Sequence, residues 1–166
     1  MQLTPTGRLL DTPQGRDLEL TRDIQAPIEE VWASLTESER TARWFGSWTG
    51  AGRASATVRL TLTHEDGHPE ADLTVIGCEP CSRLEVEAFD DHGRWHLEAW
   101  LTADAQGTTL RFVHHLDPEV KAASTGPGWE YYLDMLAASL TGNEVAGFDD
   151  YLSAMTLHYE RLDTAS

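Results

Sequence analysis

The sequence predicts an α+β fold in which an antiparallel β-sheet is covered on one face by a long C-terminal helix. Three observations predict it. Between residues 55 and 115, apolar residues recur at every second position, as they do in strands with one buried face. Turn-forming residues interrupt this segment at regular intervals, which is typical of an antiparallel meander. After residue 128 the apolar residues recur at helical spacing instead, and a sheet with one apolar face needs such a cover.

The N-terminal part predicts a β-hairpin followed by a helix. Residues 8–11 and 17–24 can form two strands, because Thr12-Pro13-Gln14-Gly15 between them is rich in turn-forming residues. Pro27 suits the first turn of a helix, where its missing N–H would have no partner anyway. The apolar side chains that follow at helical spacing are Ile28, Val31, Trp32 and Leu35.

A second short helix is expected directly after the first. Thr36 and Glu39 have the spacing of a capping box, which predicts that this helix begins here. It is expected to end at Trp44-Phe45-Gly46. Residues 47–54 contain two glycines and are expected to form a loop.

The alternating segment predicts five strands. Their apolar-face residues are Val58, Leu60 and Leu62; Leu73 and Val75; Leu84, Val86 and Ala88; Trp95, Leu97, Ala99 and Leu101; and Leu110, Phe112 and His114. The turns are expected at residues 65–67, 79–80, 90–93 and 104–107. The five strands should therefore form a sheet with one dry face and one wet face.

Two helices are expected at the C-terminal end. The first begins after Gly126-Pro127-Gly128 and ends at Gly142-Asn143. Its apolar stripe is Trp129, Tyr132, Leu133, Leu136 and Leu140. The second spans about residues 148–162, where Asp149 and Asp150 suit the positive end of a helix dipole.

Composition and charge limit the possible functions. The 166 residues fit one domain, 1–166, and 40% hydrophobic against 24% charged residues is an ordinary globular balance. Twelve basic and 28 acidic residues give a net charge of −16, which disfavours binding to nucleic acid or to anionic membranes. An acidic docking face for a basic partner remains an alternative to simple solubility. The absence of a signal-peptide pattern and of a long apolar run predicts a cytoplasmic protein.

Several segments together resemble the START-like (SRPBCC) superfamily, and within it the branch named for homology to the heat-shock-protein-90 ATPase activator. The opening segments are Ala26-Pro27-Ile28-Glu29-Glu30-Val31-Trp32, Leu35-Thr36-Glu37 and Trp44-Phe45. The later ones are Cys78-Glu79-Pro80 before Arg83-Leu84, Gly107-Thr108-Thr109-Leu110 before His114, and Gly128-Trp129-Glu130-Tyr131-Tyr132-Leu133. The resemblance covers about residues 7–162, and Cys81 stands where this branch usually has a second proline.

The resemblance implies a helix-grip fold, in which a curved antiparallel sheet wraps around a long C-terminal helix and leaves an apolar cavity. Members of the superfamily bind lipids, polyketides, hormones or similar molecules there, and some catalyse cyclisation or dehydration. The true co-chaperone carries an additional N-terminal domain, for which this chain has no room. The resemblance therefore favours a small apolar ligand over a contact with the chaperone, and a homodimer remains possible.

Two motifs match chemistry that their context does not support. His64-Glu65-Asp66-Gly67-His68 has the spacing of a zinc-protease helix, but Asp66-Gly67 and Pro69 favour a turn. The two histidines could still face each other across a hairpin and hold a metal weakly. Cys78 and Cys81 have a redox spacing, but they join two strands with no helix to lower a thiol pKa. We therefore expect a structural turn, with oxidation as the alternative, and neither a metal nor a cofactor; Gly50-Ala51-Gly52 precedes a strand and cannot cradle phosphate.

The candidate ligand-binding residues lie on the predicted inward faces. They are Trp44, Leu60, Leu73, Val75, Val86, Trp95, Leu97, Phe112, His114, Trp129, Tyr132, Leu133 and Leu136. Aromatic stripes are often plain core, but large rings around one sheet–helix interface also form pocket walls.

His114 is the polar member of this set. It is either a core histidine with a hydrogen-bond partner or the polar anchor or acid–base group of a cavity. Three functions follow from these alternatives: binding of a small apolar ligand, a cyclase or dehydratase that uses His114, and a protein-interaction or chaperone-cofactor role.

Overall fold

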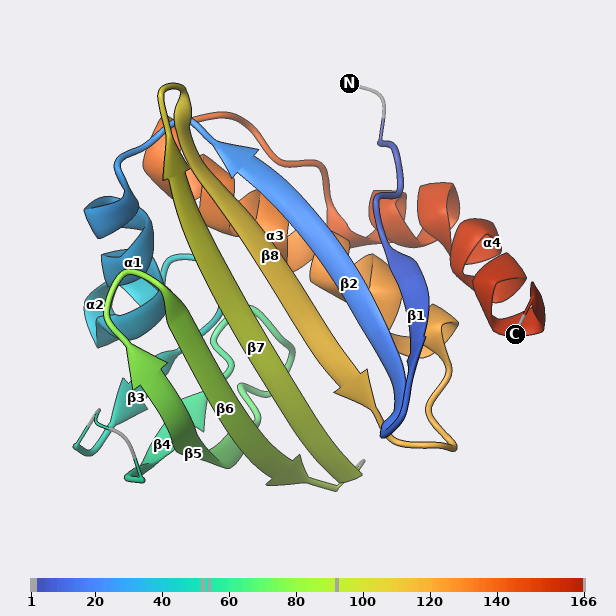
Figure 1. The fold of residues 1–166 in the computed structure, drawn as a ribbon, viewed down its shortest axis with the longest axis horizontal. Helices are drawn as coiled ribbons and strands as arrows, with labels where there is room; N and C mark the ends of the chain where they lie inside the picture. The colour runs from blue at the N-terminus through green and yellow to red at the C-terminus, as the bar shows by residue number, and fades with distance from the viewer. Residues whose placement is uncertain (1–2, 52, 54, 92, 166) are drawn as a thin grey trace.

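The structure is a computed structural model and describes residues 3–51, 53, 55–91 and 93–165. Within these residues the chain forms eight strands and four helices (Figure 1). In chain order they are β1 (Arg8–Thr12), β2 (Gly15–Ile24), α1 (Ile28–Thr36), α2 (Ser38–Thr41), β3 (Ser47–Thr49), β4 (Thr57–Thr61), β5 (Glu70–Glu79), β6 (Arg83–Asp90), β7 (Gly93–Asp104), β8 (Gly107–Leu116), α3 (Ala122–Thr141) and α4 (Phe148–Ala165). This architecture confirms the predicted α+β class.

The eight strands form one antiparallel sheet in the order β1-β2-β8-β7-β6-β5-β4-β3. The N-terminal hairpin adds to the meander through β2, which pairs with β8. The sheet curves around α3, and α1 and α2 lie at one end of it (Figure 1). The predicted helix-grip fold is therefore confirmed.

A bulge in β5 changes which side chains face inward. The register between β5 and β6 shifts between Val75 and Gly77, so that Cys78 pairs with Leu84. Ile76 is 45% exposed, whereas Val75 is buried. The extra residue in the bulge restarts the alternation, and Cys78 joins Leu73 and Val75 on the inner face. A Cβ atom at Gly77 would lie 2.7 Å from Nη1 of Arg83, the end of a flexible side chain that could move aside.

The segment after α1 differs from its prediction in three ways. The capping box is wrong: Glu37 is the N-cap of α2 without a side-chain hydrogen bond, and the Thr36 hydroxyl donates to the Trp32 carbonyl. The helix ends at Thr41, whose carbonyl then accepts hydrogen bonds from Phe45 and Gly46. The expected loop from residue 47 contains strand β3, which pairs with β4.

Helix α3 begins at Ala122, before the predicted start at Trp129, because α4 supports its first turns. The Asp163 carboxylate accepts hydrogen bonds from the backbone N–H groups of Ala122 and Ala123 at 2.7 and 3.0 Å. Gly126 is pressed against Tyr159, where a Cβ atom would lie 2.4 Å from the ring. These contacts outweigh the weak helix propensity of Gly126-Pro127-Gly128. The predicted end at Gly142 is confirmed, with φ of 80° at that residue.

Buried polar contacts hold α3 against the sheet. Glu130 is 0% exposed and accepts hydrogen bonds from Arg22 of β2 and from the backbone and hydroxyl of Thr6. Arg22 also donates to Asp134, and Asp134 accepts from Tyr151 of α4. Among the described residues, no helix is long and apolar enough to cross a membrane.

Candidate functional site

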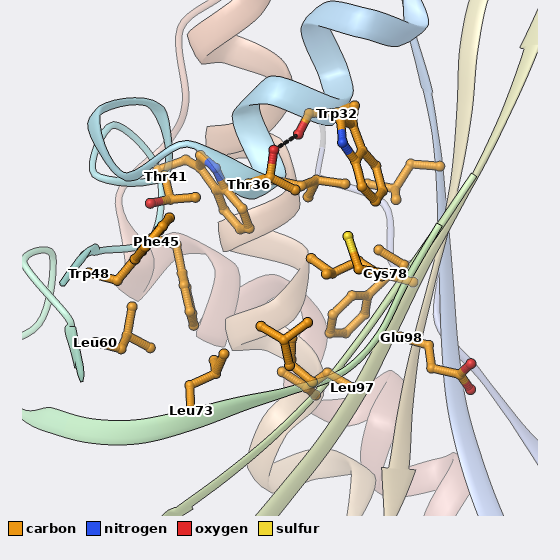
Figure 2. Close-up of a pocket in the computed structure, with 18 of the residues that line it drawn as sticks. Trp32, Thr36, Thr41, Phe45, Trp48, Leu60, Leu73, Cys78, Leu97 and Glu98 are labelled. Carbon is orange, nitrogen blue, oxygen red and sulfur yellow. Dashed lines mark hydrogen bonds between the residues drawn. The ribbon is translucent and has the colours of Figure 1, made fainter. Parts of the chain in front are cut away.

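A cavity of about 350 Å³ lies between the sheet, α1, α2 and α3; we call it the inner cavity (Figure 2). Its lining is almost entirely apolar and comes from strands β3 to β8 and three helices. The lining residues are Trp32, Leu35, Thr36, Thr41, Trp44, Phe45, Trp48, Val58, Leu60, Leu73, Val75, Cys78, Leu84, Val86, Leu97, Glu98, Ala99, Leu110, Phe112, Trp129 and Leu133.

Glu98 is the acidic residue at this cavity, but its carboxylate is directed away from the other lining side chains (Figure 2). One carboxylate oxygen accepts from Arg83 at 3.0 Å, and the other lies 2.5 Å from Nε2 of His115 on the opposite face of the sheet. The charge of Glu98 is therefore neutralised outside the cavity. The hydroxyls of Thr36 and Thr41 donate to backbone carbonyls of their own helices, so the wall holds apolar ligands best.

A second cavity, of about 700 Å³, lies beside the first and is lined by α3, the meander and the segment after β4; we call it the outer cavity. Phe45, Leu60, Leu73, Leu97 and Trp129 line both cavities and form the wall between them. The remaining residues of the outer cavity are Leu62, His64, Glu65, Asp66, Ala71, Ala88, Asp90, Trp95, Ser124, Thr125, Gly128, Tyr131, Tyr132 and Phe148. Its mouth is therefore polar, whereas its wall toward the core is apolar.

Most of the residues predicted from the sequence line one of these cavities. Those at the inner cavity are Trp44, Leu60, Leu73, Val75, Val86, Leu97, Phe112, Trp129 and Leu133, and Trp95 and Tyr132 lie at the outer cavity. Leu136 and His114 line neither cavity and are buried in the core.

The sequence analysis did not single out the lining residues contributed by α1, α2 and β3. Trp32 and Leu35 belong to the apolar stripe of the first helix, so the helical spacing could have predicted that they face the cavity. Phe45 follows helix α2, and Trp48 lies in the three-residue strand β3. Neither segment is long enough for a periodic pattern to predict which way a side chain points. Phe45 packs edge-on against Tyr132 at 5.1 Å and is stacked with Trp44 at 5.3 Å between ring centroids.

His114 is bound on one side by an indole and stacked on another. Trp129 Nε1 donates a hydrogen bond to His114 Nδ1 at 3.1 Å, and the Trp95 ring is stacked on the imidazole at 5.3 Å. Burial, with the nearby His115 and His96, lowers the pKa of His114 to about 4. The imidazole is thus neutral at pH 7, and its position favours the core-histidine alternative.

The metal-like motif, residues 64–68, lies between β4 and β5, and the redox-like motif, residues 78–81, covers the end of β5 and the turn after it. His64 Nε2 lies 3.0 Å from the Ala42 carbonyl, and His68 has a positive φ of 45° in the turn after β4. Among the described residues, no three histidine, cysteine, aspartate or glutamate side chains are placed to hold a metal ion. Cys78 lies near the end of β5 and Cys81 in the β5–β6 turn, and both are free thiols.

Three solved structures illustrate the fold that this chain shares with known proteins. CalU16 of Micromonospora echinospora matches with a TM-score of 0.76 in its crystal structure, at 22% identity over 97% of this chain and 98% of that chain. DynU16, a protein of the dynemicin biosynthetic locus, matches with a TM-score of 0.67 and 26% identity over 75% of this chain and 47% of that chain. EF2215 of Enterococcus faecalis matches with a TM-score of 0.71 and 19% identity over 95% and 91% of the two chains.

No curated protein matches the chain by sequence. The family described as "Activator of Hsp90 ATPase homolog 1-like protein" matches residues 25–141. This range begins at Gln25, shortly before α1, and ends at the last residue of α3. That match spans well over half of the chain and contains α1 to α3, strands β3 to β8, and the lining residues of both cavities except Phe148. The chain therefore belongs to the family of Activator of Hsp90 ATPase homolog 1-like proteins.

Proposed function

We propose that this protein binds a small, mainly apolar molecule in the inner cavity. The observation that supports it is a cavity of about 350 Å³ whose lining side chains are aliphatic or aromatic except for Thr36, Thr41, Cys78 and Glu98. Cavities of a few hundred cubic ångströms with such walls are typical of small-molecule sites. Well-packed cores leave few voids larger than a water molecule, so a space of this size is more than a packing defect.

The walls also favour an aromatic or polycyclic ligand. Five large aromatic side chains line the cavity, namely Trp32, Trp44, Phe45, Trp48 and Trp129. Aromatic rings prefer offset or edge-to-face contacts with other rings, which add to the hydrophobic contribution. A ligand with fused rings would gain both from the burial of its apolar surface and from contacts with these rings.

The placement of His114 favours binding over an acid–base reaction that uses this residue. A general acid or base must reach the proton it transfers, directly or through one water. Nδ1 of His114 already accepts from Trp129, and His114 lines neither cavity. We infer that His114 positions Trp129 in the cavity wall. The biosynthetic locus of DynU16 is a setting that suits a small-molecule ligand.

The test fills the inner cavity by replacing Ala99 of β7 with leucine. The control is the same replacement at Ala103 of the same strand. Ala99 is buried and lines the inner cavity, whereas Ala103 is exposed near the end of β7. N-phenyl-1-naphthylamine is a neutral apolar probe whose fluorescence rises on binding. We expect the wild type and A103L to bind it equally, and A99L to bind it at least tenfold more weakly. Failure of the wild type to bind this probe, or equal binding by A99L, would refute the proposal.

A further inference from the structure

The outer cavity combines an aromatic wall with an acidic mouth. Trp95, Trp129, Tyr131 and Tyr132 contribute rings to it, and the rings of Trp95 and Trp129 meet edge-on at 6.2 Å. Glu65, Asp66 and Asp90 also line it and are exposed. None of the described lining residues is an arginine or a lysine, so the local charge at this mouth is negative.

The carboxylates of Glu65 and Asp66 are not neutralised by any residue that the structure describes. Glu65 accepts a hydrogen bond from the Tyr132 hydroxyl at 2.5 Å, which fixes its position over the cavity. Neither Glu65 nor Asp66 forms an ion pair among the described residues. Two adjacent carboxylates without a cation repel each other, and an ammonium group placed between them would relieve this repulsion.

Thr125 is a second and independent sign of a ligand. It is 9% exposed, lines the outer cavity, and its hydroxyl is buried without a hydrogen-bond partner in the described part of the chain. Buried hydroxyls are normally paired, and a threonine in a helix can usually bond to a carbonyl of the preceding turn. This hydroxyl is shielded in the free protein, so a rotation of the Thr125 side chain toward the cavity would bring it to a polar group of a ligand.

Thr125 and Tyr132 lie on the same face of α3. Their spacing of i and i+7 corresponds to two helical turns, about 10 Å along the axis. Trp129, at i+4, lies between them on this face. A ligand along α3 would thus meet a hydroxyl at one end, an indole in the middle and the Tyr132–Glu65 pair at the other end.

The N-terminus of α3 does not turn this cavity into an anion site. Its first two backbone N–H groups, on Ala122 and Ala123, are already bound by the Asp163 carboxylate. That carboxylate also offsets the positive end of the helix dipole. The carboxylates of Glu65 and Asp66, by contrast, line the cavity without an ion-pair partner among the described residues.

We propose that the outer cavity is a second binding site, selective for an organic amine that carries its positive charge at the Glu65–Asp66 mouth and its apolar body against Trp95 and Trp129. Cations also gain from aromatic faces, most of all tryptophan. This site shares Trp129 with the inner cavity, but Glu65, Asp66 and Trp95 line the outer cavity alone.

Three probes with one indole body and different charge test this selectivity. They are tryptamine, a cation; tryptophol, its neutral alcohol; and indole-3-acetate, an anion. Isothermal titration calorimetry at low salt gives the three affinities. Each exposed carboxylate contributes a factor of about two to five, so tryptamine should bind about tenfold more tightly than tryptophol, with indole-3-acetate weakest. No measurable binding of tryptamine at millimolar concentration, or equal binding of tryptamine and tryptophol, would overturn the proposal.

The double variant Glu65→Gln, Asp66→Asn removes the charge but keeps the acceptor oxygen that the Tyr132 hydroxyl requires. It should bind tryptophol as the wild type does and lose the preference for tryptamine. Glu144→Gln with Glu160→Gln removes the same charge at exposed sites that line neither cavity, and should keep the preference. If the first double variant kept it too, the acidic mouth would not be the site.

A99L separates this site from the inner cavity. This variant should bind tryptamine as tightly as the wild type, because Ala99 does not line the outer cavity. Loss of tryptamine binding in A99L, with retention in the Glu65–Asp66 variant, would place the amine in the inner cavity and refute the second site.

Discussion

The indole N–H of Trp129 donates to Nδ1 of His114 at 3.1 Å, so a tryptophan of α3 is fixed to strand β8 by one buried hydrogen bond. Trp129 lines both cavities, and His114 is 1% exposed. The bond therefore sets the position of the ring that separates the two cavities. Because both partners are buried in an apolar layer, the hydrogen bond is kept only when α3 and the sheet are in one relative position.

Replacing His114 by leucine should destabilise the protein by about 2 kcal/mol, because the Trp129 N–H is left buried without an acceptor. Urea unfolding measures the change, and the indole N–H resonance of Trp129 should shift in a proton–nitrogen spectrum. Thr102→Leu, at an exposed position of β7, is the control and should change stability little. A His114→Leu protein as stable as the control would show that the hydrogen bond contributes nothing to folding.

The depressed pKa of His114 predicts a loss of stability in mild acid. Burial, with the charges of His115 and His96, lowers this pKa to about 4, against about 6.5 in an unfolded chain. Between these values the unfolded state binds the proton and the folded state does not, so stability falls as the pH drops from about 6.5 toward 4.

Between pH 7 and pH 5 this effect is worth about 2 kcal/mol. Urea unfolding at the two pH values should show it in the wild type, and His114→Leu should show a decrease that is smaller by this amount. The His114 ring protons followed by NMR give the pKa directly. A value near 6.5 in the folded protein would contradict the burial argument.

The sequence predicted the meander and the end of α3 because both depend on local pattern. Alternation of Val58 with Leu60 and of Leu110 with Phe112 is decided by the two-residue repeat of a strand. Gly142 ends α3 because it accepts the left-handed conformation without strain. Neither depends on residues far away in the chain.

Other features depend on contacts that no local pattern contains. Strand β3 has three residues and exists through its pairing with β4. The early start of α3 depends on Asp163, about forty positions later. Cys78 faces the inner cavity because a bulge shifts the register at Gly77, and an isolated glycine in a strand is only a weak signal for a bulge.

The buried pair of Arg22 and Glu130 yields a further prediction. Glu130 is 0% exposed and lies 3.1 Å from Arg22. Glu130→Gln keeps the shape but removes the charge, so Arg22 keeps Asp134 as its charged partner and loses the buried one. Because Arg22 is not left without a counter-charge, the expected cost is that of a charged hydrogen bond, about 2 kcal/mol. Glu119→Gln, at an exposed position, is the control in urea unfolding, and equal stability of the two variants would contradict this estimate.

Thr125→Val should make the free protein more stable, unlike most substitutions in a core. Valine has the shape of threonine without the hydroxyl, and the Thr125 hydroxyl is buried without a partner among the described residues. An unpaired buried hydroxyl costs about 1–3 kcal/mol. The substitution of threonine by valine changes the β-branched shape and the helix propensity little. We expect a gain of about 1 kcal/mol in urea unfolding.

Thr41→Val is the matched control for this gain, because the Thr41 hydroxyl donates to the Ser38 carbonyl at 3.1 Å. There the substitution removes a satisfied hydrogen bond and should lower stability by about 1 kcal/mol. Opposite signs at the two positions would mean that Thr125 keeps its hydroxyl at a cost to the fold, as expected for a residue that serves a ligand. A loss of stability at both positions would mean that the Thr125 hydroxyl has a partner in solution and is not available to one.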